Sequence, residues 1–312
     1  MGFYAPAQLV RDAREHGAEV RAVDVNFSDW GCTLEPLDKA GEGKLPGNRC
    51  AVRLGLRQVK GFHAHDGETV EGARGRGFDS VRHMWLATGL APRVVERLAD
   101  ADAFRSIGLD RRAALWAVRG LGGYGGGQNG KMPAALPLFA AMEEGGLQTE
   151  EETALPPMPP GEHVALDYST LRLSLKAHPV SFLRSRLAAR GAVPHERLRH
   201  IDDRKRVSVA GIVLARQRPG TASGVIFATL EDETGVANLV IWPRVFEAHR
   251  RIVLTSRLML VKGRVQKEGI VIHVVADEIV DMTDELGLLY DMDEAAVRGR
   301  TARIIPGSRD FH

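Results

Sequence analysis

Hydrophobic and polar residues alternate most clearly between residues 204 and 281, in the last third of the chain. Short runs rich in β-branched residues are separated there by Gly, Pro or Asp, a pattern typical of strands joined by tight turns. The polar segment 243–251 predicts a short helix after the third run. The expected strands are 207–216, 225–230, 236–242, 258–264 and 270–276.

Alternate residues of the second and third strands form one wholly aliphatic side and one mixed side, which carries Phe227 and Asn238. We expect the mixed side to be the open face of the sheet. Five strands with a helix between the third and fourth is the order of the OB-fold, a small barrel that binds single-stranded nucleic acid or oligosaccharide.

Charge is distributed unevenly along the chain. Residues 204–268 hold 12 lysines and arginines and 5 acidic residues, a net charge of +7, whereas the whole chain carries only +2. Such asymmetry indicates a surface for a polyanion. The alternative is a barrel with a solvated basic exterior and aromatic residues in its core.

Composition excludes several classes of protein. The 312 residues are 44% hydrophobic and 26% charged, as in folded chains of two or three domains, and no run approaches the ~20 apolar residues of a membrane helix. Cys32 and Cys50 cannot form a disulfide framework and lack metal-ligand spacing, so we expect a cytoplasmic protein. His63 and His65 lack a second cluster, and we expect surface residues there and no metal site.

The first third predicts mainly helices. Residues 5–16 form a helical pattern with Leu9, Val10 and Ala13 inward, although residues 1–50 hold too few large apolar side chains to close a core alone. They pack either on the next domain or on a segment upstream. Helices are expected at 80–88, 91–101 and 111–119, with Asp79 and Asp110 as caps.

Turns at Gly61 and Gly108 lie between these helices and could present backbone N–H groups to a phosphate; simple packing is the alternative. Gly120–Gly130 is a Gly-rich linker. The apolar peptide after it either docks in a partner's groove or packs on its own domain, with Leu136, Leu138 and Phe139 as anchors. Most of the tail after the barrel is expected to be mobile.

Several blocks together resemble the bacterial error-prone DNA polymerases of the C family, relatives of the replicative polymerase III alpha subunit. They cover nearly the whole chain in the family's order. The blocks are Met1–Arg14, Val23–Asn26, Ser28–Trp30, Cys32–Glu35, Arg53–Gly61, Ala103–Phe104, Leu109–Trp116, Asp167–Tyr168, Leu173–Pro179, Gln217–Thr221, Val225–Phe227, Leu230–Asn238 and Ser308–His312.

The resemblance implies a multidomain α+β protein in which a helical helix-hairpin-helix region precedes a C-terminal five-stranded OB-fold barrel. The implied parts are the end of a fingers domain (1–50), the helix-hairpin-helix region (51–130), a linker with a degenerate clamp-binding peptide (131–160), a helical connector (161–203), the barrel (204–283) and a tail (284–312).

The function implied by the resemblance is that of a DNA-directed DNA polymerase in damage-induced translesion synthesis. The family's palm, whose aspartates bind the catalytic metals, would lie upstream of Met1. This chain alone is therefore expected to be inactive, with Mg²⁺ needed only by the complete polymerase. Ala135–Phe139 lacks the leading Gln of the family's clamp-binding peptide, which favours contact with the sliding clamp through accessory damage-tolerance proteins.

The expected partners are single-stranded template and primer–template duplex. A protein-interaction module that docks on the clamp or on accessory proteins is the alternative function, and a remnant without function is a third. We expect phosphate contacts from basic side chains and base stacking on two aromatic rings. The expected phosphate contacts are Arg216, Arg218, Arg244, Lys262, Arg264 and Lys267, and the expected stacking residues are Phe227 and Trp242.

Overall fold

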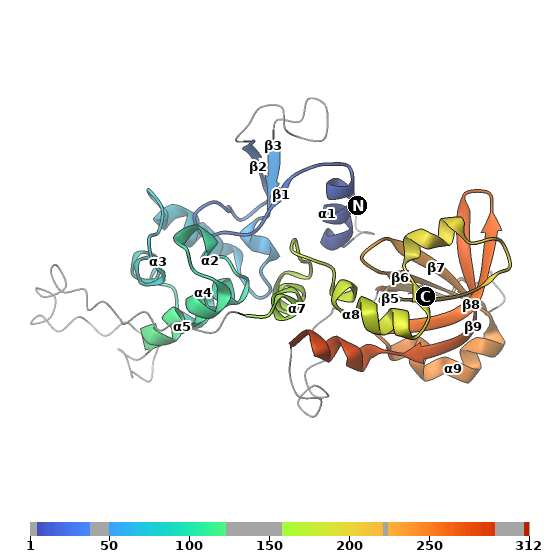
Figure 1. Ribbon diagram of the computed structural model, residues 1–312. Helices are drawn as coiled ribbons and strands as arrows, with labels where there is room; N and C mark the ends of the chain where they lie inside the picture. The colour runs from blue at the N-terminus through green and yellow to red at the C-terminus, as the bar shows by residue number, and fades with distance from the viewer. Residues whose placement is uncertain (1–4, 38–49, 123–157, 221–223, 291–308, 312) are drawn as a thin grey trace, which may run out of the picture. The chain divides into compact units, whose positions relative to one another are not determined.

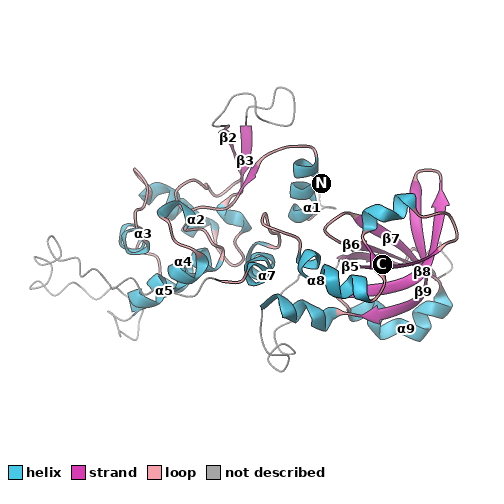
Figure 2. Cartoon of the chain, viewed as in Figure 1, coloured by secondary structure: helices cyan, strands magenta, loops and turns pink. Residues whose placement is uncertain are grey.

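The computed structural model describes residues 5–37, 50–122, 158–220, 224–290 and 309–311. The chain divides into two compact units, Met1–Met158 and Pro159–His312. Helices predominate in the described part of the first unit, and most of the strands belong to the second (Figures 1 and 2). None of the described helices is long and apolar enough to cross a membrane.

The first unit opens with helix α1 (Pro6–Glu15) and a small sheet of β1 (Val20–Arg21), β2 (Thr33–Pro36) and β3 (Cys50–Arg53). β3 lies between the other two strands, parallel to β1 and antiparallel to β2. This pairing runs across the domain boundary expected at residue 50. The described residues before residue 50 are thus paired with the region that follows them. This agrees with the first of the two alternatives given above, packing on the next domain.

The helices of the first unit agree closely with the expected ones. Ser80, rather than Asp79, caps α3 by accepting a hydrogen bond from the His83 N–H. The Asp110 carboxylate accepts the Ala113 N–H at 2.8 Å, and this cap starts α5. The elements are η1 (Leu56–Gln58), α2 (Ala64–Ala73), α3 (Val81–Thr88), α4 (Pro92–Asp100), η2 (Arg105–Ile107) and α5 (Arg111–Gly122).

Helix α1 differs from the expectation in its packing. Leu9 is 58% exposed, and no residue of α1 is buried, so the prediction that Leu9 points inward was wrong. Val10 and Ala13 are half-buried, so of the three residues expected to point inward Leu9 alone is exposed.

The second unit contains a closed five-stranded barrel, which confirms the fold expected from the sequence. Its strands follow the order β5-β6-β7-β9-β8, and β8 pairs back with β5. Only β7 and β9 are parallel within this ring. The strands are β5 (Arg206–Gln217), β6 (Ile226–Glu231), β7 (Val236–Ile241), β8 (Leu258–Glu268) and β9 (Val271–Asp281), with helix α9 (Pro243–Thr255) between β7 and β8.

Two apolar cores hold this unit together. The aliphatic side of β6 and β7 fills the barrel, as the alternation predicted, and Phe246 and Val253 of α9 close it. A second core lies between the outer side of β5 and β8 and a helical layer. Leu183 and Leu187 pack there against Leu258 and Leu260. The layer comprises α7 (Pro160–Leu171), α8 (Pro179–Ala189) and η4 (Thr283–Tyr290), while β4 (Ala192–Val193) and η3 (His195–His200) lead into the barrel.

The described parts of the tail, 284–290 and 309–311, belong to η4 and β10, while the expectation that most of the tail is mobile stays a prediction. Leu286 and Leu289 of η4 are buried in the second core because they cover apolar residues that the barrel leaves outside. At the far end, β10 (Arg309–Phe311) pairs in parallel with residues 215–217 of β5.

Candidate nucleic-acid interface

The open face of the barrel is the outer side of β6 and β7. Register places Phe227 between Gln217 of β5 and Val240 of β7, and Thr229 opposite Asn238. The side chains of β6 and β7 in these rows are half-buried, whereas their neighbours in sequence are buried. The helical layer covers β5 and β8 on another side, so this mixed face is left open, as expected from the alternation.

Exposed apolar side chains continue the open face at both ends. Trp242 follows the outward row of β7 and is 54% exposed at the start of α9. At the opposite end, Val236 of β7 and Val271 of β9 both lie two residues before the Asn238–His273 pair. They are 52% and 43% exposed, and Ile270 in the adjoining turn is 98% exposed. Among these exposed groups, Trp242 supplies an aromatic ring of the kind on which unpaired bases stack.

The basic residues near Trp242 come from the loop after β5 and from α9. The guanidinium groups of Arg218 and Arg250 lie 5.7 and 5.5 Å from the centre of the Phe246 ring. Arg244 is exposed in the first turn of α9. The structure therefore brings Arg218, Trp242 and Arg244 to the same end of the barrel, while Phe227 lies on the neighbouring face.

The other predicted cations lie elsewhere. Lys262 and Arg264 are on β8, which the strand order separates from β6 and β7, and each faces a carboxylate of β9. Lys262 Nζ is 3.1 Å from Glu278 and Arg264 Nε is 3.9 Å from Asp277. Lys267 donates to the Arg199 carbonyl at 2.9 Å. The predicted contacts thus do not form one continuous surface.

The buried position of Arg216 contradicts the prediction that this residue contacts a nucleic-acid backbone. The side chain is only 7% exposed, and its guanidinium donates to the backbone carbonyls of Val253 and Ser256 at the end of α9. Its place in β5 follows a register shift between Val213 and Ala215. The residue joins β5 to α9, and we assign it a structural role.

The two glycine turns of the first unit both have the expected left-handed backbone, with φ of +74° at Gly61 and +81° at Gly108. The Gly61 carbonyl accepts a hydrogen bond from Arg97 of α4, which braces the first turn. Gly108 follows η2 and precedes the Asp110 cap of α5. Phosphate contact at these turns stays a prediction.

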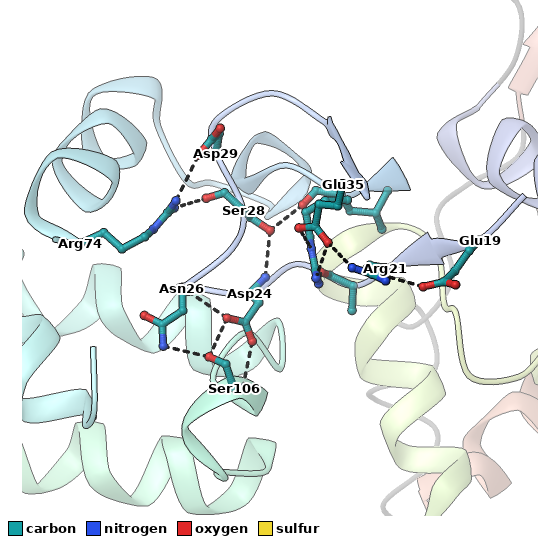
Figure 3. A network of polar contacts seen from close by, with 12 residues as sticks. Glu19, Arg21, Asp24, Asn26, Ser28, Asp29, Glu35, Arg74 and Ser106 are labelled. Carbon is teal, nitrogen blue, oxygen red and sulfur yellow. Dashed lines mark hydrogen bonds and ion pairs between the residues drawn. The ribbon is translucent and has the colours of Figure 1, made fainter. Parts of the chain in front are cut away.

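A polar network that the sequence did not predict holds the second turn (Figure 3). The buried Asp24 carboxylate accepts the Ser106 N–H at 3.0 Å and its hydroxyl at 2.7 Å. Asn26 donates to the Ser106 hydroxyl at 3.0 Å and exchanges two hydrogen bonds with the Phe78 backbone. The segment around residues 24–26 thus joins the start of α3 to the turn before Gly108.

Arg74 holds the part of this network that follows Asp24 in the sequence. This residue donates to the carbonyls of Val25 and Ser28 and to the Asp29 carboxylate. Nearby, Glu35 accepts two hydrogen bonds from Arg53, which lower the pKa of the glutamate against the effect of its burial. The Val23–Asn26 and Ser28–Trp30 blocks, noted only as family resemblance, supply most of these contacts.

A second buried polar cluster joins the turn between β6 and β7 to the helical layer. Asp232 accepts the backbone N–H of His195 at 3.0 Å and a guanidinium hydrogen of Arg184 at 2.7 Å. Arg184 also bonds Glu233, and these two acids raise its pKa even though burial lowers it. The cluster fixes one end of the open face to the layer behind it.

Leu136, Leu138 and Phe139 lie outside the described residues, so their expected role stays a prediction. Within the described ranges, no group of three or more His, Cys, Asp and Glu residues could hold a metal ion. The described residues therefore do not fit the catalytic metal site of a polymerase, and no step of phosphoryl transfer is assigned to them.

Comparisons with known proteins match both units. A family described as the helix-hairpin-helix motif matches residues 17–114, and a family described as the OB-fold nucleic acid binding domain matches residues 207–282. The first match begins well before residue 50, as does the sheet that joins that segment to the helices.

The chain is also similar to curated proteins over nearly its whole length. It is 51% identical to "Error-prone DNA polymerase 1" of Rhizobium meliloti over 93% of this chain and 26% of that protein. It is 48% identical to "Error-prone DNA polymerase" of Ruegeria pomeroyi and of Caulobacter vibrioides, over 100% of this chain and 28% and 29% of those proteins. The expected resemblance is thus confirmed, and the chain spans a little over a quarter of these relatives.

Proposed function

Because the chain is related over nearly its whole length to a portion of the error-prone DNA polymerases, we propose that it is a DNA-binding, C-terminal part of such an enzyme. In this proposal the barrel holds single-stranded template on its open face, and the helical hairpins contact duplex phosphates. The complete enzyme would carry out template-directed synthesis past damaged bases, and the expected requirement for Mg²⁺ would belong to that complete enzyme.

The observation that supports this proposal most strongly is the open face itself. The OB-fold match spans β6 and β7, whose outer side carries the half-buried pair Phe227 and Val240, and the exposed Trp242 follows directly after β7. The exposed Trp242 ring leaves apolar area in contact with water in the isolated protein, whereas the same ring would stack favourably on an unpaired base.

The helical hairpins support the second half of the proposal. The helix-hairpin-helix match covers both left-handed turns, at Gly61 and Gly108. Glycine allows such a turn to bring backbone N–H groups close to a phosphate. The Asp24–Ser106 hydrogen bonds keep the second turn in one conformation, which lowers the entropy lost on binding.

Fluorescence anisotropy of a labelled single strand of about 20 nucleotides, measured over a salt series with the full chain, tests this function. We expect log Kd to rise linearly with log salt, with a slope near 0.7 for each phosphate contacted. A primer–template duplex, run in parallel, tests the hairpins. A folded chain that binds neither ligand at low salt would contradict the proposal and favour the protein-docking alternative.

A further inference from the structure

One end of the barrel carries a concentrated group of arginines, here called the α9 surface. It consists of Arg218 from the loop after β5 and of Arg244, Arg250 and Arg251 from α9, all exposed. Glu247 is the one carboxylate in the sequence of α9. The α9 surface therefore has a net charge of +3 when Glu247 is included.

The core of the barrel fixes part of this charge in place. Phe246 is only 3% exposed, yet Arg218 and Arg250 both lie against its ring. A Cβ at Gly224 would lie 3.6 Å from Pro243 and 3.7 Å from the Arg218 guanidinium, so the loop approaches the start of α9. Two guanidinium groups held beside one ring repel each other, and a phosphodiester would relieve that repulsion.

Trp242 makes the α9 surface continuous with the open face. It directly precedes Pro243, the first residue of α9, and continues the outward row of Asn238 and Val240 on β7. A nucleic-acid strand that runs along β7 and stacks on Trp242 would reach Arg244 next.

The cations of β8 provide a contrast. Lys262 and Arg264 each face a carboxylate of β9, which offsets their charge. Arg250 has one such neighbour, Glu247 at 3.5 Å, whereas Arg244 and Arg251 form no ion pair with any of the described residues. Attraction for a polyanion is therefore stronger at the α9 surface than along β8.

We propose that the α9 surface binds the phosphodiester backbone of a single strand where that strand leaves the open face, so that the site extends beyond the barrel strands. This inference rests on the proposed function, because the strand must first lie on the open face. A short strand that fills only the open face would not reach the α9 surface, whereas a longer strand would.

The test compares an oligothymidine of about eight nucleotides with one of about 20, since a single OB-fold occupies roughly 4–16 nucleotides. The full chain is compared with Arg244→Gln/Arg251→Gln, which leaves the Phe246 contacts intact. Lys262→Gln/Arg264→Gln removes the same charge from β8 and is the matched control. For the 20-mer, we expect the salt slope of the α9 variant to fall by roughly 1.4, from about 0.7 for each lost phosphate contact. Its affinity for the 8-mer should stay unchanged.

The outcomes separate this inference from the function on which it rests. If the unsubstituted chain binds neither strand, the proposed function itself fails. If it binds both strands and the α9 variant keeps the full slope on the 20-mer, the α9 surface is not a contact although the barrel is. Equal losses in the α9 and β8 variants, or equal losses on the short and long strands, would also overturn the inference.

Discussion

Asp24 and Ser106 lie 82 residues apart in the sequence, yet the carboxylate of one accepts both the N–H and the hydroxyl of the other. Asp24 is 5% exposed, and replacing it with Ala removes one charged acceptor that serves the Ser106 N–H, the Ser106 hydroxyl and the Asn26 N–H. We expect Asp24→Ala to lower the free energy of unfolding of the first unit by about 1–3 kcal/mol. Denaturant unfolding followed by tryptophan fluorescence measures this, since Trp30, Trp85 and Trp116 all lie in this unit.

Asp29→Ala is the matched control for Asp24. Asp29 also accepts a hydrogen bond across the network, from Arg74 at 3.1 Å, but its side chain is 48% exposed. Water can replace this contact, so we expect a loss below about 1 kcal/mol. If both variants lose the same free energy of unfolding, the burial of Asp24 does not make its hydrogen bonds more stabilising than those of Asp29.

Gly67 and Gly72 occupy the same helix, α2, but have different surroundings. A Cβ at Gly67 would lie 2.7 Å from the Trp30 ring, whereas a Cβ at Gly72 would meet nothing within 4 Å. Gly72→Ala should stabilise the first unit by up to about 1 kcal/mol because alanine favours a helix. Gly67→Ala gains the same propensity but forces Trp30 to move, and we expect a net loss of roughly 1–3 kcal/mol. Thermal unfolding of both variants decides this, and similar melting temperatures would contradict the Trp30 contact.

The sequence predicted those features that depend on short-range patterns. Alternation in β6 and β7 placed Phe227 outside the barrel, and the period and caps of the helices placed α3 to α5 within a few residues. Arg216 was misjudged because a register shift in β5 intervenes, and an alternating pattern does not reveal such a shift. The Asp24–Ser106 pair was missed because a hydrogen bond between distant segments leaves no periodic trace in the sequence.

The predicted contact residues also show why a site is harder to predict than a fold. Lys262 and Arg264 were grouped with Phe227 because all lie within one charged stretch of sequence. The barrel closes by pairing β8 with β5, and this places the two cations beside acids of β9. The net charge of a segment therefore predicts that the partner is a polyanion, while the topology of the barrel decides which cations can contact the same nucleic-acid strand.

His195 predicts a pH dependence of stability in the second unit. Its Nδ1 lies 3.1 Å from the Gly235 carbonyl, which can only accept, so Nδ1 carries the hydrogen. The other ring nitrogen, Nε2, is buried without a partner among the described residues. Burial lowers the pKa of His195 below its usual 6.5, although Asp232 and Gly235 oppose this effect.

The direction of the pH effect follows from proton linkage. Below pH 6.5 His195 takes up a proton in the unfolded chain, whereas in the folded chain it stays neutral until the pH reaches its lower folded pKa. Stability therefore falls as the pH decreases from 6.5 towards that folded pKa. Asp232, whose pKa is also lowered, contributes only below about its usual 3.8. Denaturant unfolding from pH 5 to 7 should show this decline, and His195→Asn should flatten it. His200→Asn, at an exposed histidine of the same 3-10 helix, should not; equal profiles for all three proteins would exclude His195 as the cause.

Phe227 gives the most direct test of the open face, because it lies on the outer side of β6 between Gln217 and Val240, on the face that we propose contacts bases. Base–aromatic stacking contributes about 1–3 kcal/mol per base, so Phe227→Ala should weaken single-strand binding by roughly 5- to 150-fold. The salt slope should stay unchanged, since no phosphate contact is removed. Phe182→Ala is the matched control because this phenylalanine, 41% exposed, lies on α8 in the helical layer rather than on the open face. Anisotropy titrations with one labelled strand compare the two variants. A weaker affinity confined to Phe227→Ala would assign stacking to the open face, whereas equal affinities would place the bases on another side of the barrel.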